Sequence, residues 1–481
     1  MKGLLIQVIS GIILGLGCMG FGVSFAWPST TLLLFKSENT TLNRPMSESE
    51  AALFGSLSSV GGMIGNPLMA VLLGRLGRKY SAILSTCVGL IAWTLVVFSS
   101  TVEVILTAIF LFGVSGSVML VVPVYISEFC QENIRGIMTS LFVVFNGLGM
   151  LVSILLGSIL SYHTMTYVFL VMSGAGVVLL SILKESPVVF MQKGKEEEAK
   201  KSVAYYRSWD PNSKEVMQEI EKIKRALNPD LDEDKSIFQS PEEEKLNPEN
   251  PSIPQKPLTF MELLRKSRST RRAMVVLLVL ITAAIFQGLV VVVVYAIPLF
   301  SQVVPADVMS PALCSVLLCG INVVSSLLGG FLTDKAGRRM LIIVASFLTG
   351  TFCVIIGILI ISEWGPKWLI AVFIYLYSIS YTVGAGTVPF VMMAEVLLPE
   401  VKGYITMLIM EWAWLCNFAL LYVFQSIVAR YGIGPVFFVF AAISFLTSGY
   451  SIFFVPETKG LSVNVIQTLF LKKRRDLETE Q

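Results

Sequence analysis

The chain has little charge for its length: Asp, Glu, Lys and Arg make up 14% of its 481 residues, whereas 54% are hydrophobic. So few charged residues cannot cover the surface of the several soluble domains that this length would otherwise suggest. His163 is the one histidine, which excludes most catalytic triads and zinc sites, because both need imidazoles at set spacings. We therefore expect no enzyme, no metal site and no cofactor, and a lipid solvent for most of the chain.

Cysteine is also scarce and is not arranged for cross-linking. The seven cysteines are an odd number, and nearly all lie inside apolar segments. Such cysteines usually behave as small buried hydrophobes rather than as a disulfide framework.

What the chain has in abundance is long uncharged runs. Ten runs of 23 to 48 residues contain no Asp, Glu, Lys or Arg, and 404–429 is an eleventh if Glu411 is allowed. A membrane-spanning helix needs about 20 residues. The longest run, 136–183, is therefore expected to form two helices that turn at 161–163. The sequence predicts an all-α membrane protein with twelve transmembrane helices.

The polar residues divide these twelve helices into two sets of six. The sequence predicts an N-terminal six-helix bundle, a cytosolic linker with short helices, a C-terminal six-helix bundle and a cytosolic tail. These segments are 1–183, 184–272, 273–455 and 456–481. Within the linker, 196–227 and a short segment from Phe260 have the composition of helices, whereas the proline-rich stretch 228–257 does not.

Lysine and arginine orient the helices. If the N-terminus is cytosolic, 32 basic residues lie in inner segments, and only Lys36, Arg44, Lys367 and Arg430 lie outside. The positive-inside rule then places both termini in the cytosol. The usable glycosylation sequon at Asn39 falls in the first outer loop under this orientation, in agreement with it. We expect a multi-pass protein of the plasma membrane, and the sequence does not indicate its oligomeric state or any nucleic-acid partner.

Charged motifs recur in the same order in the two halves. Arg78 after the second helix is matched by Arg338 after the eighth, Glu128 by Glu395, and Glu185 after the sixth helix by Glu457 after the twelfth. Three signals in register indicate an internal duplication. We interpret the repeated charges as an inner gate whose ion pairs form and part, or alternatively as residues that only set topology. The predicted gate residues are Arg78, Glu128, Arg135, Glu185, Asp334, Arg338, Glu395, Lys402 and Glu457.

With these motifs the chain resembles the sugar porter family of the major facilitator superfamily, and within it the branch of insect facilitated trehalose transporters. The resemblance covers nearly the whole chain except the linker. The motifs that carry it are Gly77-Arg78-Lys79, Pro123 through Glu128 to Arg135-Gly136, Lys184-Glu185-Ser186-Pro187, Asp334 through Arg339, Pro389 through Glu395, and Pro456-Glu457-Thr458-Lys459-Gly460. It implies the major facilitator fold, with a central sugar site whose amide side chains bridge sugar hydroxyls.

The resemblance assigns two of these amides directly. Asn322 in the eighth helix and Asn417 in the eleventh stand where the family places amides, although amides also commonly join membrane helices. In the seventh helix the family's paired glutamines fall on Ala284 and Ile285, and Gln287 is one displaced substitute.

Other site positions depart further from the family. In the fifth helix the family glutamine falls on Val143, and Asn146 lies about one turn further on. Phe390 replaces the family tryptophan of the tenth helix, and we add Trp414 to the candidate contacts. We therefore expect weak, altered or non-hexose specificity.

The same comparison implies an outer gate. Tyr295 and Pro298 match the family's outer gate, although Val294 replaces one of its two tyrosines. Gly384-Ala385-Gly386 followed by Pro389 is expected to break the tenth helix beside the path. Plain packing remains an alternative for each of these residues.

The coupling residues of proton-linked relatives are missing. The first helix has no charged residue, and Ala108 stands at the position of the family arginine. The inner gate is also depleted, with Gly74 at an acidic position, Val188 at a basic one and Lys402 in place of arginine. We expect a uniporter of a neutral sugar, such as trehalose, a hexose or a polyol.

Two alternatives stay open. An intramembrane carboxylate is a functional candidate by default, so Glu411 raises the possibility of a proton-coupled carrier of another small solute. The second alternative is a sugar sensor on a transporter scaffold that signals through the linker or the basic tail residues 472–475.

Overall fold

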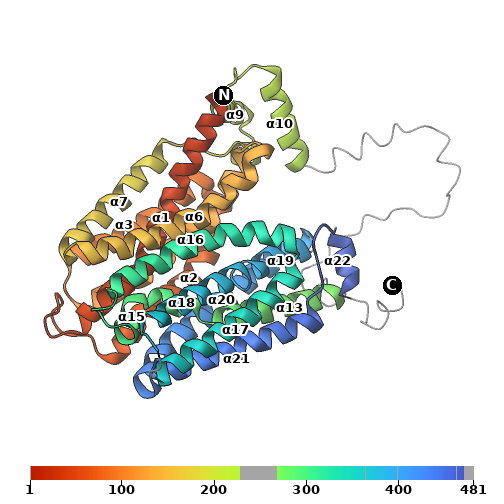
Figure 1. Ribbon diagram of the computed structural model, residues 1–481. Coiled ribbons are helices and arrows are strands. Elements are labelled where there is room, and N and C mark those ends of the chain that lie inside the picture. The colour runs from red at the N-terminus through yellow and green to blue at the C-terminus, as the bar shows by residue number, and fades with distance from the viewer. Residues whose placement is uncertain (1, 228–267, 363–364, 398, 462, 471–481) are drawn as a thin grey trace, which may run out of the picture.

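The computed structural model describes residues 2–227, 268–362, 365–397, 399–461 and 463–470. Within these ranges every regular element is a helix, and twelve helices or helix pairs are long and apolar enough to cross a membrane. We number these spans 1 to 12. Figure 1 shows two sets of helices lying against each other, the first half of the chain in red to yellow and the second in green to blue.

The first six spans follow the predicted runs closely. The long run 136–183 is two helices, as predicted: α6 ends at Ile159, and the Ser161 hydroxyl accepts a hydrogen bond from the Thr164 N–H at the start of α7. The elements of this half are α1 (Lys2–Lys36), α2 (Glu48–Leu76), α3 (Arg78–Phe98), α4 (Val102–Ser115) with α5 (Val118–Phe129), α6 (Glu132–Ile159) and α7 (Tyr162–Ile182).

The last six spans contain more interruptions. Spans 7 and 10 are each divided between two helices, and a further short helix follows span 7. The elements are α13 (Arg268–Phe286), α14 (Leu289–Val294), α15 (Ala296–Val303), α16 (Pro311–Ala336), α17 (Arg338–Ser362), α18 (Trp368–Val383), α19 (Val388–Val396), α20 (Pro399–Tyr431) and α21 (Ile433–Phe454), followed by the short α22 (Val463–Leu469).

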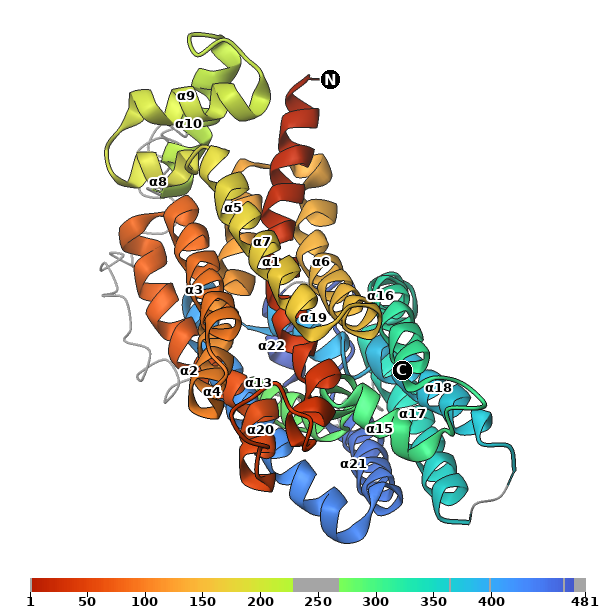
Figure 2. The same ribbon diagram turned by 90° about the vertical axis from the view of Figure 1, so that its left-hand side faces the viewer.

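Three short helices lie between the halves in sequence: α8 (Pro187–Gln192), α9 (Glu196–Arg207) and α10 (Lys214–Leu227). The last two confirm the helices expected over 196–227. Figure 2 shows all three at the end of the molecule that carries the N-terminus, beside the first-half spans. We call this end the termini side. The remainder of the predicted linker, 228–267, and the tail, 471–481, lie outside the described residues.

Helix α9 is fixed to the first half by a buried tyrosine. The ring of Tyr206 stacks on Phe129 with 4.5 Å between centroids, and the Gln7 side chain donates to the Tyr206 carbonyl over 3.1 Å. Burial raises the pKa of the Tyr206 phenol, so the phenol stays neutral and donates to the Lys184 carbonyl oxygen at 2.6 Å. The linker helices therefore form one layer with the first six spans.

The broken spans have local causes. In span 10, α18 ends at Val383 and α19 begins at Val388, which confirms the break expected from Gly384, Gly386 and Pro389. The break in span 7 at Gly288 was not predicted. Gly288 has φ +91°, and a Cβ there would lie 2.3 Å from the Phe440 ring of α21. Only glycine satisfies both the left-handed backbone and the close packing.

The two halves meet away from the termini side. Helix α2 packs against α20, α6 against α16, and α1 against α14 and α15. Figure 1 shows the two sets close together around α15 and farther apart toward α10 and α22. A large apolar cluster crosses between the halves at the end opposite the termini side, which we call the closed end, and includes Trp27, Phe54 and Tyr295.

Candidate substrate site and its gates

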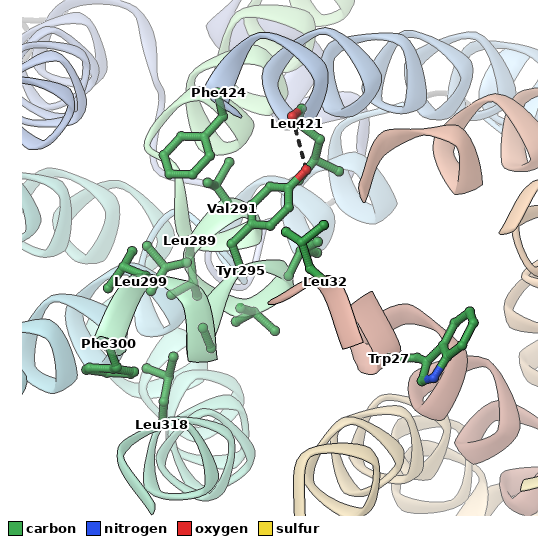
Figure 3. Packing of buried hydrophobic residues seen from close by; sticks show 14 of the residues in the cluster. Trp27, Leu32, Leu289, Val291, Tyr295, Leu299, Phe300, Leu318, Leu421 and Phe424 are labelled. Carbon is green, nitrogen blue, oxygen red and sulfur yellow. Dashed lines mark hydrogen bonds between the residues drawn. The ribbon is translucent and has the colours of Figure 1, made fainter. Parts of the chain in front are cut away.

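Tyr295 forms a tight contact between the halves at the closed end. It is buried, and its ring stacks on Phe424 with 5.4 Å between centroids. Its hydroxyl donates to the Leu421 carbonyl over 3.3 Å, as Figure 3 shows. Across the interface it packs against Gly55 of α2, where a Cβ would lie 1.8 Å from the Tyr295 hydroxyl oxygen. The predicted outer-gate tyrosine thus occupies space that only a glycine in the other half leaves free.

The other predicted outer-gate residues are both prolines near helix starts. Pro298 is buried in α15, next to Ile297, whose N–H donates to the Ser29 hydroxyl of α1 over 3.0 Å. Pro389 is buried in the first turn of α19, where a missing N–H costs nothing. Pro298 thus lies at a hydrogen bond between the halves, and Pro389 lies at the helix break.

A second glycine contact lies further along α2. A Cβ at Gly62 would lie 2.9 Å from the indole of Trp414 on α20. Trp414 is half-buried, and Asn417 is about one turn further along the same helix. The contact places Trp414 of span 11 directly against the first half.

Asn322 is held by hydroxyl groups of span 10. Its Oδ1 accepts hydrogen bonds from Ser378 at 2.7 Å and from Thr382 at 3.1 Å. Its buried Nδ2 has no partner among the described residues. The two hydroxyls fix the orientation of the amide and leave its N–H groups to donate elsewhere.

Gln287 lies in the break of span 7 and is fully buried. Its Nε2 donates to the Thr447 hydroxyl of α21 over 3.2 Å, and its backbone carbonyl accepts from the Tyr377 hydroxyl at 2.7 Å. Its Oε1 has no partner among the described residues. This amide therefore has one acceptor atom left for a further hydrogen bond.

The other two candidate amides share this property. The Oδ1 atoms of Asn146 and Asn417 are buried and unpartnered within the described part of the chain. Asn146 and Asn322 also lie at the same contact between the halves, because a Cβ at Gly147 would be 2.8 Å from Val323. Burying an amide atom without a hydrogen bond is costly, so these four atoms are candidates for a hydrogen bond with a bound solute or water.

The sixth binding candidate, Phe390, is more exposed than the rest. It follows Pro389 in α19, and 45% of its surface is exposed. Two of the amides bind hydroxyl groups that were not predicted, those of Ser378, Thr382 and Thr447. Ser378 and Thr382 are four residues apart on one helical face, and this spacing is the signal that could have identified them.

In the first half the repeated charges on the termini side form a network within that half. Arg78 pairs with Glu128 at 2.8 Å. Oε1 of Glu185 accepts from the backbone N–H groups of Arg78, Lys79 and Ser186 at 3.0, 3.1 and 2.8 Å. The carboxylate thereby neutralises the N-terminus of α3.

The second half repeats this arrangement. Arg338 pairs with Glu395 at 2.7 Å and with Asp334 at 3.2 Å, and Glu457 accepts the Arg338 N–H at 2.9 Å. Gly74, which replaces the matching acid in the first half, is exposed with open space around it.

Two predicted gate cations lie at the separated ends of spans 5 and 11. Arg135 is exposed, and Lys402 donates to the Ala394 carbonyl of its own half over 2.6 Å. Among the described residues, each ion pair of the spanning helices on the termini side joins groups of the same half.

Comparison with known proteins agrees with this arrangement. The family model described as "Sugar (and other) transporter" matches residues 5–470. The chain belongs to this sugar transporter family. It is a family of transporters and not a class of enzymes.

Curated relatives and solved structures match along nearly the full chain. The facilitated trehalose transporter Tret1 of Drosophila yakuba is 25% identical over 98% of this chain, and this chain spans 53% of that relative's length. Tret1 of Polypedilum vanderplanki is 24% identical, with 98% of this chain and 90% of the relative covered. The inward-open structure of the xylose transporter XylE from E. coli superposes with a TM-score of 0.74 at 19% identity, covering 95% of this chain and 98% of XylE.

In this member of the sugar transporter family, two further predicted residues lie apart from the four amide side chains. Glu411 on α20 is half-buried, and its Oε1 is buried without a partner in the described ranges. Asn39 is exposed in the loop between α1 and α2, on the side opposite the termini. Both positions remain compatible with the coupling and glycosylation roles that the sequence suggests.

Proposed function

We propose that this protein is a facilitative alternating-access transporter of a neutral sugar or polyol in the plasma membrane. Both termini would be cytosolic, which makes the termini side the inner side. The observation that carries the proposal is the set of four amides on spans 5, 7, 8 and 11, each with one unpartnered polar atom. Sugar hydroxyls donate and accept hydrogen bonds, so they can satisfy both amide oxygens and amide N–H groups.

The proposed transport cycle follows from the contacts between the halves. In the described conformation the outer side is closed by Tyr295 on Gly55 and by the Ser29–Ile297 hydrogen bond. Opening the outer side requires these contacts to part while each half keeps its own ion network. A bound sugar would contact amides from both halves and so favour the closure of one half upon the other.

The amide chemistry also bears on the substrate. The side chain of Gln287 is already partly used, because its Nε2 donates to Thr447, and its unpartnered atom is Oε1. A lost sugar hydrogen bond costs about 0.5–1.5 kcal/mol. We therefore propose a substrate other than a tightly bound hexose, and trehalose is the first to test because the curated relatives are trehalose transporters.

The test is radiolabelled uptake in oocytes over a panel of trehalose, glucose, fructose and polyols. We expect saturable flux that Asn322→Ala or Asn417→Ala abolishes, with Asn212→Ala on the exposed linker as a matched control. Surface biotinylation corrects for expression. If surface-expressed protein carries none of these solutes, the transporter proposal is wrong, and ligand binding without flux would favour the sensor alternative.

A second proposal, proton coupling, rests on the buried and unpartnered oxygen of Glu411. A coupled carrier would show uptake that rises with an inward proton gradient and loses this dependence in Glu411→Gln. Uptake that is independent of pH and unchanged in the variant would exclude coupling through this residue.

A further inference from the structure

A basic cavity lies on the termini side, apart from the path between the halves. Its volume is about 400 Å³, and it is formed by the end of α2, the start of α3, the end of α7 and helix α8. Four lysines line it: Lys79, Lys184, Lys193 and Lys195. Two carboxylates, Glu185 and Glu198, line it as well.

Both carboxylates of this cavity already have partners within the protein. Oε1 of Glu185 binds the backbone N–H groups at the start of α3, and Glu198 pairs with Lys195 at 3.4 Å. The Lys79 ammonium donates to the Ser181 carbonyl at 2.8 Å, and Lys193 reaches the Leu76 carbonyl only at 3.5 Å. An ammonium carries three N–H donors, so both lysines retain donors for an anion.

One polar atom of a residue in the cavity lining has no hydrogen-bond partner among the described residues. Glu185 is 7% exposed, and its Oε2 is buried without a partner among the described residues. A lipid phosphodiester has no hydroxyl of its own at neutral pH, so a neighbouring hydroxyl of the same headgroup is the group that can donate to this carboxylate oxygen. The lining therefore suits a phosphate that carries neighbouring hydroxyl groups.

The cavity lies at the level where the spans leave the membrane. Span 6 ends at Ile182 and span 3 begins at Arg78. Ile182 and Tyr80 are 62% and 58% exposed, and Leu76, at the end of span 2, is exposed as well. Exposed apolar side chains next to lysines at a helix end are typical of the membrane–water interface.

We propose that this cavity binds the hydroxyl-bearing phosphate headgroup of an anionic membrane lipid, with an inositol or glycerol headgroup as the fitting class. Lys79, Lys184 and Lys193 contact the phosphate, and Glu185 accepts from a headgroup hydroxyl. Because α8 forms one wall, the lipid joins the linker layer to the ends of spans 2, 3 and 6.

The experiment measures lipid binding to the purified full-length protein by native mass spectrometry, with dioctanoyl-phosphatidylinositol, dioctanoyl-phosphatidylcholine and inorganic phosphate as probes. We expect saturable binding of the inositol lipid and much weaker binding of the choline lipid. Each lysine near an anionic headgroup contributes about fivefold in affinity. The double variant Lys184→Ala with Lys193→Ala should therefore bind about 25-fold more weakly.

Two control variants distinguish binding at this cavity from general electrostatic attraction between basic residues and anionic lipid. Lys222→Ala removes an exposed lysine of α10 outside the cavity and should leave binding unchanged. Replacing Lys184 and Lys193 by arginine keeps the charge and should preserve binding, which shows that the alanine effect is not misfolding. Equal weakening by Lys222→Ala, or inorganic phosphate that competes as well as the lipid, would overturn the proposal. The readout does not depend on transport, so a failed uptake test leaves it intact.

Discussion

The contact between Gly55 and Tyr295 makes the substitution Gly55→Ala a direct test of the closed end. The added methyl group would lie 1.8 Å from the Tyr295 hydroxyl oxygen and 2.5 Å from its ring carbon Cζ. The tyrosine cannot easily move aside, because it is buried, stacked on Phe424 and hydrogen-bonded to Leu421. The halves must therefore separate at this point.

The size of the effect follows from overpacking. Adding a methyl group to a well-packed interface costs about 1–3 kcal/mol. Gly55 and Tyr295 belong to different halves, so the cost falls on the described conformation and not on the fold of either half. The fraction of molecules in which the two halves are apart at the closed end should rise about 5- to 150-fold.

The assay is labelling of a cysteine introduced at Leu32, a buried position of α1 in the apolar cluster at the closed end. A membrane-impermeant maleimide should modify it faster in Gly55→Ala by the same factor. Gly74→Ala is the matched control, because it lies on the same helix with nothing within 4 Å of the new methyl group. Equal labelling rates in the Gly55→Ala and Gly74→Ala backgrounds would refute the reasoning.

Three further substitutions test other features. Gly288→Ala should lower the unfolding temperature strongly, because it strains a backbone at φ +91° and collides with α21; a thermal unfolding curve in detergent checks this. Glu457→Ala should cost about 0.5–2 kcal/mol by leaving the α17 N-terminus uncapped, and denaturant unfolding measures the loss. The double variant Ser378→Ala with Thr382→Val should raise the KM for sugar uptake while surface expression stays largely unchanged, because Asn322 loses its orientation. A KM equal to that of the unmodified protein would contradict this role.

Features encoded along the chain were predictable from the sequence. The turn at Ser161 and the break of span 10 at its glycines follow from local chemistry, and the number of spans follows from run length. The family match likewise confirms the fold that the duplicated charges suggested.

Features that depend on distant packing were not predictable. The break of span 7 places Gly288 at φ +91° against the Phe440 ring, where a side chain would not fit, and Phe440 is far away in the sequence. No periodicity in the sequence pairs Gly55 with Tyr295 or Gly62 with Trp414. The repeated charges were recognisable in the sequence and their gate role stays a prediction. The backbone role of Glu185 was not predicted, because a sequence does not show that a carboxylate will bind N–H groups of a distant helix.

The glycine contacts also bear on how abruptly the closed end releases. A side chain packed against bare backbone is held by short-range attraction that falls steeply within about an ångström. Tyr295 and Trp414 therefore have almost no intermediate positions in which they are partly attached. Such an interface separates in one step, so molecules in which these contacts are only partly formed should be rare.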